Sequence, residues 1–256
     1  MTEFDQTFAG RPIALRHDGP RDDGHTTGFV WLGGFMSDMT GTKAEAVADF
    51  AREVQRPCLR FDYSGHGQSG GTFTDGTISR WLAEARQMML GHTRSPRILV
   101  GSSMGGWIAA LLLRSLDARN AARIKGLVLI APAHDFTEKL MWDRFGFDAR
   151  DAIATDGVWM RPSAWGSGYP ITRALIEDGR NHLLLDEPYA CMCPVHILQG
   201  SDDADVPWQH ALKIHEGISG PRVRFTLVKS GDHRLSSADD IRLLKSVLAE
   251  MAGPMP

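Results

Sequence analysis

Ser103 stands in the stretch whose residue types and spacing most clearly indicate chemistry. It is the centre of Gly101-Ser102-Ser103-Met104-Gly105, which follows the strand-like run 97–100 and precedes the apolar run 107–113. A strand, a tight turn and a helix in this order are typical of a nucleophile elbow, in which the turn lifts the serine above the end of a parallel strand. The two glycines leave room for a strained turn and for close approach of helix and strand. We therefore predict that Ser103 is a nucleophile.

A second match to the same five-residue pattern lies at Gly67-Gln68-Ser69-Gly70-Gly71. A Tyr-Ser-Gly-His loop precedes it and Thr72-Phe73-Thr74-Asp75-Gly76 follows it. Neither the strand nor the helix of an elbow is therefore expected around it. We interpret Ser69 as a loop residue.

A serine hydroxyl is a weak nucleophile near neutral pH, so it needs a base, and the base needs an orienting acid. In folds with such an elbow the acid and then the histidine follow on loops after later strands. His233 comes directly after the predicted strand 223–228 and before a helix, and we predict that it is the base. Among the other histidines, His66 is the strongest alternative, because its loop also ends at the carboxyl edge of the predicted sheet.

The acid is expected in the loop after the predicted strand 195–198. This loop reads Gly200-Ser201-Asp202-Asp203-Ala204-Asp205-Val206-Pro207. We favour Asp203, three residues before Val206, and keep Asp202 and Asp205 as alternatives.

The negative oxygen that forms when a serine attacks a carbonyl needs two hydrogen-bond donors. The backbone amide of Met104, next to Ser103 at the start of the helix, is predicted to be one. The second is predicted to be the amide of Phe35, after Gly33-Gly34 at the end of an earlier strand. Substrate contacts are assigned to Met36, Trp159 and Trp208.

The elements that must position these residues alternate along the chain, as in a mostly parallel, doubly wound α/β sheet. The predicted strands are 12–16 (at the sheet edge), 29–32, 58–61, 97–100, 126–130, 195–198 and 223–228. The predicted helices are 43–54, 78–89, 107–113, 208–216 and a last one that opens with the capping box Ser236-Ser237-Ala238-Asp239.

Residues 134–182 break the alternation with short helical pieces, several glycines, and Trp142, Trp159 and Trp165. An insertion of this kind predicts a small helical lid over the carboxyl edge of the sheet. Its aromatic residues either contact substrate or pack the lid onto the body. We predict one domain over residues 1–256 with this lid.

Composition narrows the function classes. A net charge of −3 in 256 residues gives no reason to expect nucleic acid or an anionic membrane as partner. The longest apolar run, 107–113, is too short to span a bilayer, and no stable membrane anchor is expected. The acidic N-terminus lacks the apolar core of a signal peptide, and the three cysteines suggest a reducing compartment, so a cytoplasmic location is predicted.

Cys191 and Cys193 with His196 could be read as metal ligands, but no fourth ligand stands at useful spacing. We interpret the two cysteines as buried thiols beside a strand. Neither a metal nor an organic cofactor is predicted.

Several stretches resemble the α/β-hydrolase superfamily and, within it, the group of palmitoyl-protein thioesterases that includes mycophenolic acid acyl-glucuronide esterases. They are GFMSDMTGTKA (34–44), RFDYSGHG (60–67), LVGSSMGGW (99–107), GVWMRPS (157–163), DADVPW (203–208) and DHRL (232–235). The resemblance implies an α/β-hydrolase fold, the triad Ser103, Asp203 and His233, and an acyl ester or acyl thioester as substrate. The additional Asp202 before Asp203 departs from the pattern of the group.

Together these features predict a serine hydrolase that cleaves esters or thioesters of apolar acyl or aryl groups through an acyl-enzyme. The expected partners are a small-molecule ester or acyl thioester and, as a further candidate, an acylated protein. Two alternatives stay open: an acyltransferase or perhydrolase that uses the same acyl-enzyme, and a non-catalytic binding protein on the same scaffold.

Overall fold

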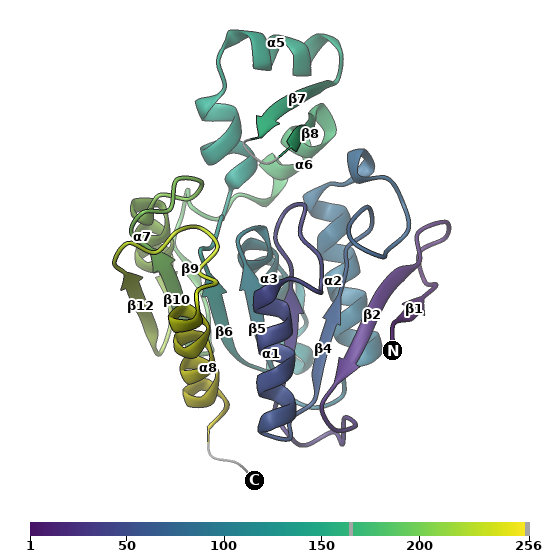
Figure 1. Cartoon of the computed structure of the whole chain (residues 1–256), viewed down its shortest axis with the longest axis vertical. Coiled ribbons are helices and arrows are strands. Elements are labelled where there is room, and N and C mark those ends of the chain that lie inside the picture. The colour runs from purple at the N-terminus through teal and green to yellow at the C-terminus, as the bar shows by residue number, and fades with distance from the viewer. Residues whose placement is uncertain (164–165, 254–256) are drawn as a thin grey trace.

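An eight-stranded sheet runs through the computed structural model, which describes residues 1–163 and 166–253. Across the sheet the strands lie in the order β1, β2, β4, β3, β5, β6, β10, β12 (Figure 1). β2 pairs antiparallel with both β1 and β4, and the other neighbouring pairs are parallel. The bounds are β1 Glu3–Asp5, β2 Ile13–Asp18, β3 Gly28–Leu32, β4 Cys58–Phe61, β5 Arg97–Ser102, β6 Ile124–Ile130, β10 Val195–Gly200 and β12 Val223–Val228.

The predicted strands are confirmed, with one correction at the edge of the sheet. β1 pairs with the outer side of β2, so β2 is not the edge strand that the sequence predicted. β1 has three residues, too few for an alternating pattern to stand out.

Helices cover both faces of the sheet because the central strands are apolar on both sides. Along β5, Ile98 and Val100 face one core cluster and Leu99 faces the other. α1 (Thr42–Glu53) and α8 (Ala238–Ala252) pack on the first face, and α2 (Ile78–His92), α3 (Met104–Ser115) and α7 (Trp208–Gly217) on the second. Strands buried on both faces are typical of a doubly wound parallel sheet.

The first turn of α8 corrects the predicted capping box by one residue. The hydroxyl of Ser237, rather than that of Ser236, accepts from the amide of Asp240 at 3.2 Å. The carboxylate of Asp240 in turn accepts from the amide of Ser237 at 3.0 Å. Two serines in a row make the pattern ambiguous, and the path of the chain into the helix selects the second.

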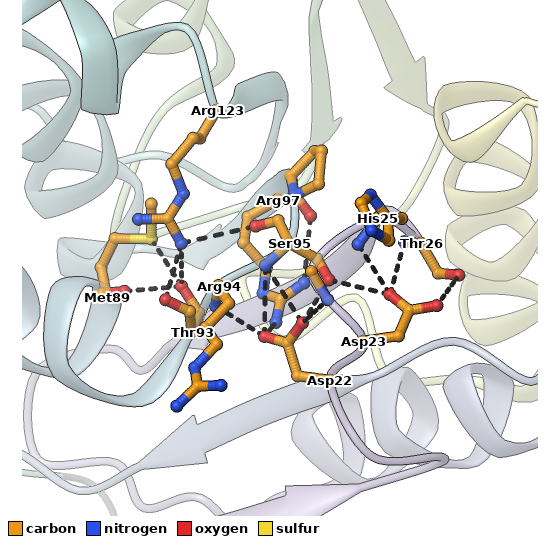
Figure 2. A network of polar contacts seen from close by, with 12 residues as sticks. Asp22, Asp23, His25, Thr26, Met89, Thr93, Arg94, Ser95, Arg97 and Arg123 are labelled. Atoms are coloured by element: carbon orange, nitrogen blue, oxygen red, sulfur yellow. Dashed lines mark hydrogen bonds and ion pairs between the residues drawn. The ribbon is translucent and has the colours of Figure 1, made fainter.

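The amino end of β5 is fixed by the polar network shown in Figure 2. The carboxylate of Asp22 accepts from the amides of Arg94 (2.7 Å) and Ser95 (3.0 Å) and pairs with Arg97. Burial opposes the charge of Asp22, but these hydrogen bonds and the charge of Arg97 lower its pKa to about 2. The network therefore holds the start of the strand whose far end leads into Ser103.

The segment between β6 and β9 (Tyr189–Ala190) departs from the strand–helix alternation and rises from the carboxyl end of β6 (Figure 1). It contains the π-helical turn η2, the 3₁₀ turns η3 and η4, the helices α5 and α6, and an antiparallel pair, β7 and β8. The bounds are η2 Phe136–Met141, η3 Trp142–Arg144, α5 Phe147–Thr155, β7 Val158–Ser163, β8 Gly166–Thr172, α6 Arg173–Gly179 and η4 Arg180–His182.

The prediction of a helical lid is therefore wrong in part, because a β-hairpin lies between its helices. The run Val158-Trp159-Met160 is apolar throughout, and so short a run does not distinguish helix from strand. Trp165 lies outside the described residues. The remaining short elements are η1 Phe73–Asp75, α4 Ala118–Ala121 and β11 Ile218–Ser219, which pairs with β9.

Asp135 joins the two ends of this lid. Its carboxylate accepts from the amides of Leu184 and Leu185, each at 2.8 Å. Beside it, the hydroxyl of Tyr189 bonds to Nε2 of His134 at 2.9 Å, and Nε2 of His210 donates to the carbonyl of His134 at 2.8 Å. All three acid and imidazole side chains are buried. The root of the lid is therefore held by side chains from distant parts of the chain.

Candidate active site

The turn between β5 and α3 holds Ser103 in a strained conformation, with φ 54° and ψ −118°. The amide of Ser103 donates to the carbonyl of Ile130 at 2.8 Å, and its own carbonyl accepts from the amides of Gly106 and Ala133. A Cβ at Gly105 would collide with the carbonyl oxygen of Leu32. Small residues and backbone hydrogen bonds thus stabilise a backbone conformation of Ser103 that is unfavourable in an unfolded chain.

Three side chains distant in sequence meet at this turn. The hydroxyl of Ser103 donates to Nε2 of His233 across 3.1 Å. Nδ1 of the same ring donates to a carboxylate oxygen of Asp203 across 2.8 Å. Because Nδ1 carries the proton, Nε2 is free to accept from the serine, and the carboxylate orients the ring. The arrangement can remove a proton from the hydroxyl of Ser103.

The carboxylate of Asp203 is buried and accepts four hydrogen bonds. One oxygen accepts from His233 and from Nε2 of Gln199 (2.9 Å). The other accepts from the amides of Val206 (2.8 Å) and Asp205 (3.0 Å). Gln199 is a site residue that the sequence did not reveal, since a glutamine inside a buried strand carries no motif. These contacts hold the carboxylate in place beside Nδ1 of His233.

The two alternative aspartates lie elsewhere. Asp202 is exposed and accepts from the hydroxyl of Ser201 at 2.8 Å. Asp205 is exposed in the wall of the cavity described below. The structure therefore brings Asp203 to Nδ1 of His233 rather than either neighbour.

The loop that carries His233 is held from both sides. Asp232 accepts from the amides of Arg234 and Leu235, both at 3.0 Å. From α1, the ammonium group of Lys43 donates to the carbonyl of Arg234. Burial lowers the pKa of Lys43 to about 8. These contacts immobilise the residues on either side of the imidazole.

Two amides near Ser103 have no acceptor among the residues that the structure describes, those of Phe35 and Met104. Met104 begins α3, where backbone N–H groups lack a partner in the helix. Next to Phe35, the amide of Met36 donates to Nε2 of His66 at 3.2 Å, with Met36 held at φ 56°. Phe35 and Met104 both line the same cavity as Ser103.

His66 acts as an acceptor here because its other nitrogen is occupied. Nδ1 donates to the carbonyl of Ser64 at 3.2 Å, so the proton is on Nδ1 and the lone pair is on Nε2. Burial lowers the pKa of His66 and keeps the ring neutral. The sequence singled out its loop as lying at the carboxyl edge but not this contact, which needs the loops after β3 and β4 to be adjacent.

A cavity of about 350 Å³ opens at Ser103 and is closed on one side by the lid. Its lining is mostly apolar, with charged or polar exceptions at Ser103, Arg161, Tyr169, Asp205 and His233. The apolar lining residues are Phe35, Met36, Met104, Ala133, Phe136, Leu140, Met141, Pro162 and Val206.

Of the three residues assigned to substrate contact, Met36 lines this cavity and Trp159 and Trp208 do not. The ring of Trp159 packs edge-on against Phe145, with 4.9 Å between ring centroids. Trp208 is the first residue of α7. The apolar wall under the lid is instead formed by Phe136, Leu140 and Met141, and substrate contact by the two tryptophans stays a prediction.

A second, more polar hollow of about 490 Å³ lies on the other side of Ser103 and His233. It is lined by Ser37, Asp38, Thr42, Lys43 and Arg234, among others. The serine thus lies between an apolar cavity under the lid and a polar hollow beside α1.

The other candidate residues have structural contacts. The hydroxyl of Ser69 donates to the carbonyl of Asp62 at 2.6 Å and accepts from the amide of Ala14 at 2.8 Å. Cys191 and Cys193 are buried with their sulfurs 3.6 Å apart, and His196 bonds instead to Thr226 at 2.9 Å.

Among the described residues, the group with possible metal-ligand atoms within 4.8 Å of one another is Asp203, Asp205 and His233. The two oxygens of Asp203 already accept four hydrogen bonds, and Nδ1 of His233 donates one of them. This donor set therefore fits a serine site rather than a metal site. No helix in the described part of the chain has the length and apolar character needed to cross a membrane.

Comparisons with known proteins identify the family of this chain. The profile of the family described as serine aminopeptidase, S33, matches residues 34–156. The chain is 35% identical to the mitochondrial palmitoyl-protein thioesterase ABHD10 of Mus musculus over 223 residues, which cover 86% of this chain and 73% of the mouse protein.

Two solved structures are similar over nearly their whole length. A putative hydrolase from Agrobacterium vitis S4 is 44% identical, with a TM-score of 0.92 and 99% of each chain covered. Mouse alpha/beta hydrolase domain-containing protein 10 is 30% identical, with a TM-score of 0.86 and 98% of each chain covered. The chain therefore belongs to the α/β-hydrolase superfamily, in the group of serine hydrolases that contains the mitochondrial palmitoyl-protein thioesterases.

Proposed function

We propose that this protein hydrolyses carboxylic esters or thioesters of apolar acyl or aryl groups through an acyl-enzyme on Ser103. The hydrolase class follows from its family. The observation that carries the finer proposal is the continuous hydrogen-bond chain from Ser103 through His233 to Asp203, at the mouth of an apolar cavity.

His233 acts first as a base. As the oxygen of Ser103 attacks the acyl carbon, its proton moves to Nε2, and Asp203 stabilises the imidazolium that results. The alcohol or thiol then leaves with that proton, and the acyl group stays on Ser103. Water, deprotonated by the same nitrogen, attacks the acyl carbon next, and the free acid and the serine hydroxyl are restored.

The amides of Phe35 and Met104 receive the negative oxygen of each tetrahedral intermediate. Both amides are unpaired within the described residues, and both residues line the cavity of Ser103. His66 is a positioning residue, because its bond to the amide of Met36 holds the turn that aims the amide of Phe35. A donor lost from such a pair typically costs about 10²–10³ in rate.

The acyl group is assigned to the apolar cavity and the leaving group to the polar hollow. Phe136, Leu140 and Met141 offer an alkyl or aryl group an apolar wall under the lid, as expected of a ligand pocket. Thr42 and Lys43 line the opposite hollow, which suits a polar alcohol or thiol. The name of the mouse relative supports acyl thioesters, including acylated proteins, as candidates beside small esters.

Fluorophosphonate labelling tests the nucleophile. We expect labelling at Ser103 that is abolished in Ser103→Ala and retained in Ser102→Ala. Retention of label or of esterase turnover by Ser103→Ala would refute the assignment.

Chain length and products test the reaction. Rates on 4-nitrophenyl esters and acyl thioesters should rise as the acyl chain lengthens to fill the cavity, and equal rates for all chains would contradict the apolar pocket. Product analysis with added alcohol or peroxide should find the free acid; a transferred acyl group or a peracid as main product would favour acyl transfer or perhydrolysis.

The cytoplasmic location remains a prediction. The relatives named as palmitoyl-protein thioesterases are described as mitochondrial, and the location of this chain is open to direct imaging of a tagged protein in its cells of origin.

A further inference from the structure

Arg161 is the feature of the apolar cavity that the proposed reaction does not use. It lies in β7 of the lid hairpin and lines the cavity that contains Ser103. Within residues 1–163 and 166–253, its guanidinium has neither an ion pair nor a hydrogen bond; its contact is with an aromatic ring. A guanidinium offers five N–H donors and stays charged at any physiological pH. A half-buried cation with no carboxylate within 4.0 Å in the described part of the chain requires an explanation.

The ring contact fixes the guanidinium in place. Arg161 lies opposite Tyr169 in the β7–β8 pair, and its guanidinium carbon is 5.7 Å from the centre of the Tyr169 ring. The Tyr169 ring in turn contacts the ring of Phe35 edge-on, with 5.8 Å between centroids. A guanidinium stacked on a ring keeps the donors of its edge free for a planar, two-point contact with a carboxylate. The stack therefore holds the guanidinium in the cavity wall and leaves its N–H donors free to bind an anion.

Asp205 is the carboxylate among the lining residues of this cavity, and besides burial both Asp205 and Arg161 act electrostatically on the pKa of Tyr169. Asp205 comes from the loop after β10, and one of its carboxylate oxygens lies within 4.8 Å of ligand atoms of Asp203 and His233. It is therefore near the imidazole, whereas Arg161 belongs to the lid. A substrate in this cavity therefore meets a positive group at the lid, while its reacting carbonyl lies at Ser103.

We propose that Arg161 is a specificity-determining residue that binds a carboxylate at the far end of the acyl group. The preferred substrates are then esters or thioesters of acids with an apolar chain and a second, free carboxylate. The inference rests on the proposed function, because it assumes that the acyl group lies in the cavity under the lid. It adds that the cavity selects for an anionic end rather than for a wholly apolar chain.

Matched pairs of esters test this. The probes are 4-nitrophenyl monoesters of straight-chain dicarboxylic acids of six, eight and ten carbons, each beside the same compound with its far carboxyl capped as a methyl ester. Release of nitrophenolate reports cleavage of the same bond in both. The quantity compared is the ratio of kcat/KM for the anionic ester to kcat/KM for the capped ester.

We expect wild type to prefer the anionic ester at the chain length that reaches Arg161. Arg161→Leu should lower the ratio about 10- to 100-fold, the range for a hydrogen-bonded charge pair, and Arg161→Lys should retain part of it. Arg144→Leu is the matched control: Arg144 is an exposed cation of the lid outside the cavity lining, and its removal should leave the ratio unchanged. Free dicarboxylate should inhibit wild type more strongly than Arg161→Leu.

A ratio that is the same in wild type and in Arg161→Leu, or a preference for the capped ester at every length, would overturn the proposal. An equal loss on capped esters in Arg161→Leu and Asp205→Asn, with the ratio unchanged, would overturn it in favour of a lid latch between these two residues. If wild type cleaves none of the esters and takes up no fluorophosphonate, the proposed hydrolase mechanism fails instead. If wild type is labelled and active but its ratio is the same as that of Arg161→Leu, only the role of Arg161 is refuted and the proposed hydrolase mechanism stands.

Discussion

The two walls of the apolar cavity are built in different ways. The wall formed by the sheet carries Ser103 and the amides of Phe35 and Met104 on turns at strand ends. Backbone hydrogen bonds fix these turns, as where the carbonyl of Ser103 accepts from the amides of Gly106 and Ala133. Any displacement of Ser103 would therefore break several backbone hydrogen bonds at once.

The wall formed by the lid is joined to the body through hydrogen bonds that involve side chains. Phe136, Leu140 and Met141 come from a π-helical turn, and Arg161 and Tyr169 from a two-stranded hairpin. At the lid root the main tie is one carboxylate, Asp135, on two amides. The difference indicates that the sheet wall maintains the reaction geometry. Side chains of the lid wall can be substituted without disturbing that geometry, so the lid wall determines which substrates bind. Changes in the sheet wall should therefore alter kcat, and changes in the lid should alter KM and chain preference.

The largest effect is expected at Asp203. Asp203→Asn keeps the size of the side chain but removes the charge that orients and stabilises His233, so kcat should fall about 10³–10⁴-fold. Steady-state kinetics on a short neutral ester measures this. Asp202→Asn, which alters an exposed neighbour, is the control and should remain near wild type. Comparable losses in both variants would argue against the assignment of the acid.

A smaller loss is expected at His66. His66→Ala frees the amide of Met36 and lets the turn of Phe35 relax, so kcat should fall about 10²-fold, as for loss of one oxyanion donor, with KM little changed. His66→Gln places an oxygen near the position of Nε2 and should recover part of kcat. His66→Asn is too short to reach Met36 and should not. Equal kcat for the Gln and Asn variants would show that the residue acts through general packing.

In the lid, Leu140→Ala should change the preference for acyl-chain length rather than kcat. Removing a buried leucine side chain from the cavity wall takes away about 1.5–3 kcal/mol of apolar contact, so kcat/KM on long-chain esters should fall about tenfold. Short esters should keep their kcat. Trp159→Phe, at a lid tryptophan outside the cavity lining, is the comparison and should preserve the chain-length profile. A uniform loss of kcat on all esters in Leu140→Ala would contradict the division between the two walls.

The smallest effect concerns stability and pH at the lid root. Burial lowers the pKa of His134 to about 3 and that of His210 to about 4. In the unfolded chain both take up a proton near pH 6.5, while the folded protein keeps them neutral. Their contribution to stability is therefore complete above pH 6.5 and is lost as the pH falls, by about 1.4 kcal/mol per pH unit for each. Burial raises the pKa of Asp135 to about 6, so this group acts in the opposite direction between about pH 4 and 6.

Urea unfolding at pH 7, 6 and 5 measures this dependence. His210→Gln keeps a donor for the carbonyl of His134 but cannot titrate, so the loss of stability below pH 6.5 should be shallower by about 1.4 kcal/mol per pH unit. An unchanged slope would mean that His210 is protonated in the folded protein.

Much of the fold was predictable because it depends on local patterns. The strands around Val30, Leu99 and Leu127 are short apolar runs bounded by polar or glycine-containing turns, and the predicted order of strands and helices agrees with the structure. The elbow at Ser103 was equally local: its glycines, strand and helix are contiguous in the chain. The edge strand β1 and the hairpin of the lid were missed, because three residues, or an apolar run without alternation, carry too little pattern.

The sequence by itself determined the alternation of strands and helices, the elbow at Ser103 and the short set of acids and histidines from which partners could come. The tertiary structure decided which of Asp202, Asp203 and Asp205 reaches His233, that Gln199 and His66 support the site, and that Arg161 rather than Trp159 or Trp208 faces the cavity. The physical reason is range. A strand or a tight turn is specified by neighbours a few residues away. The hydrogen bonds of His233, which lies 30 residues from Asp203 and 130 from Ser103, depend instead on how the whole sheet orders its strands.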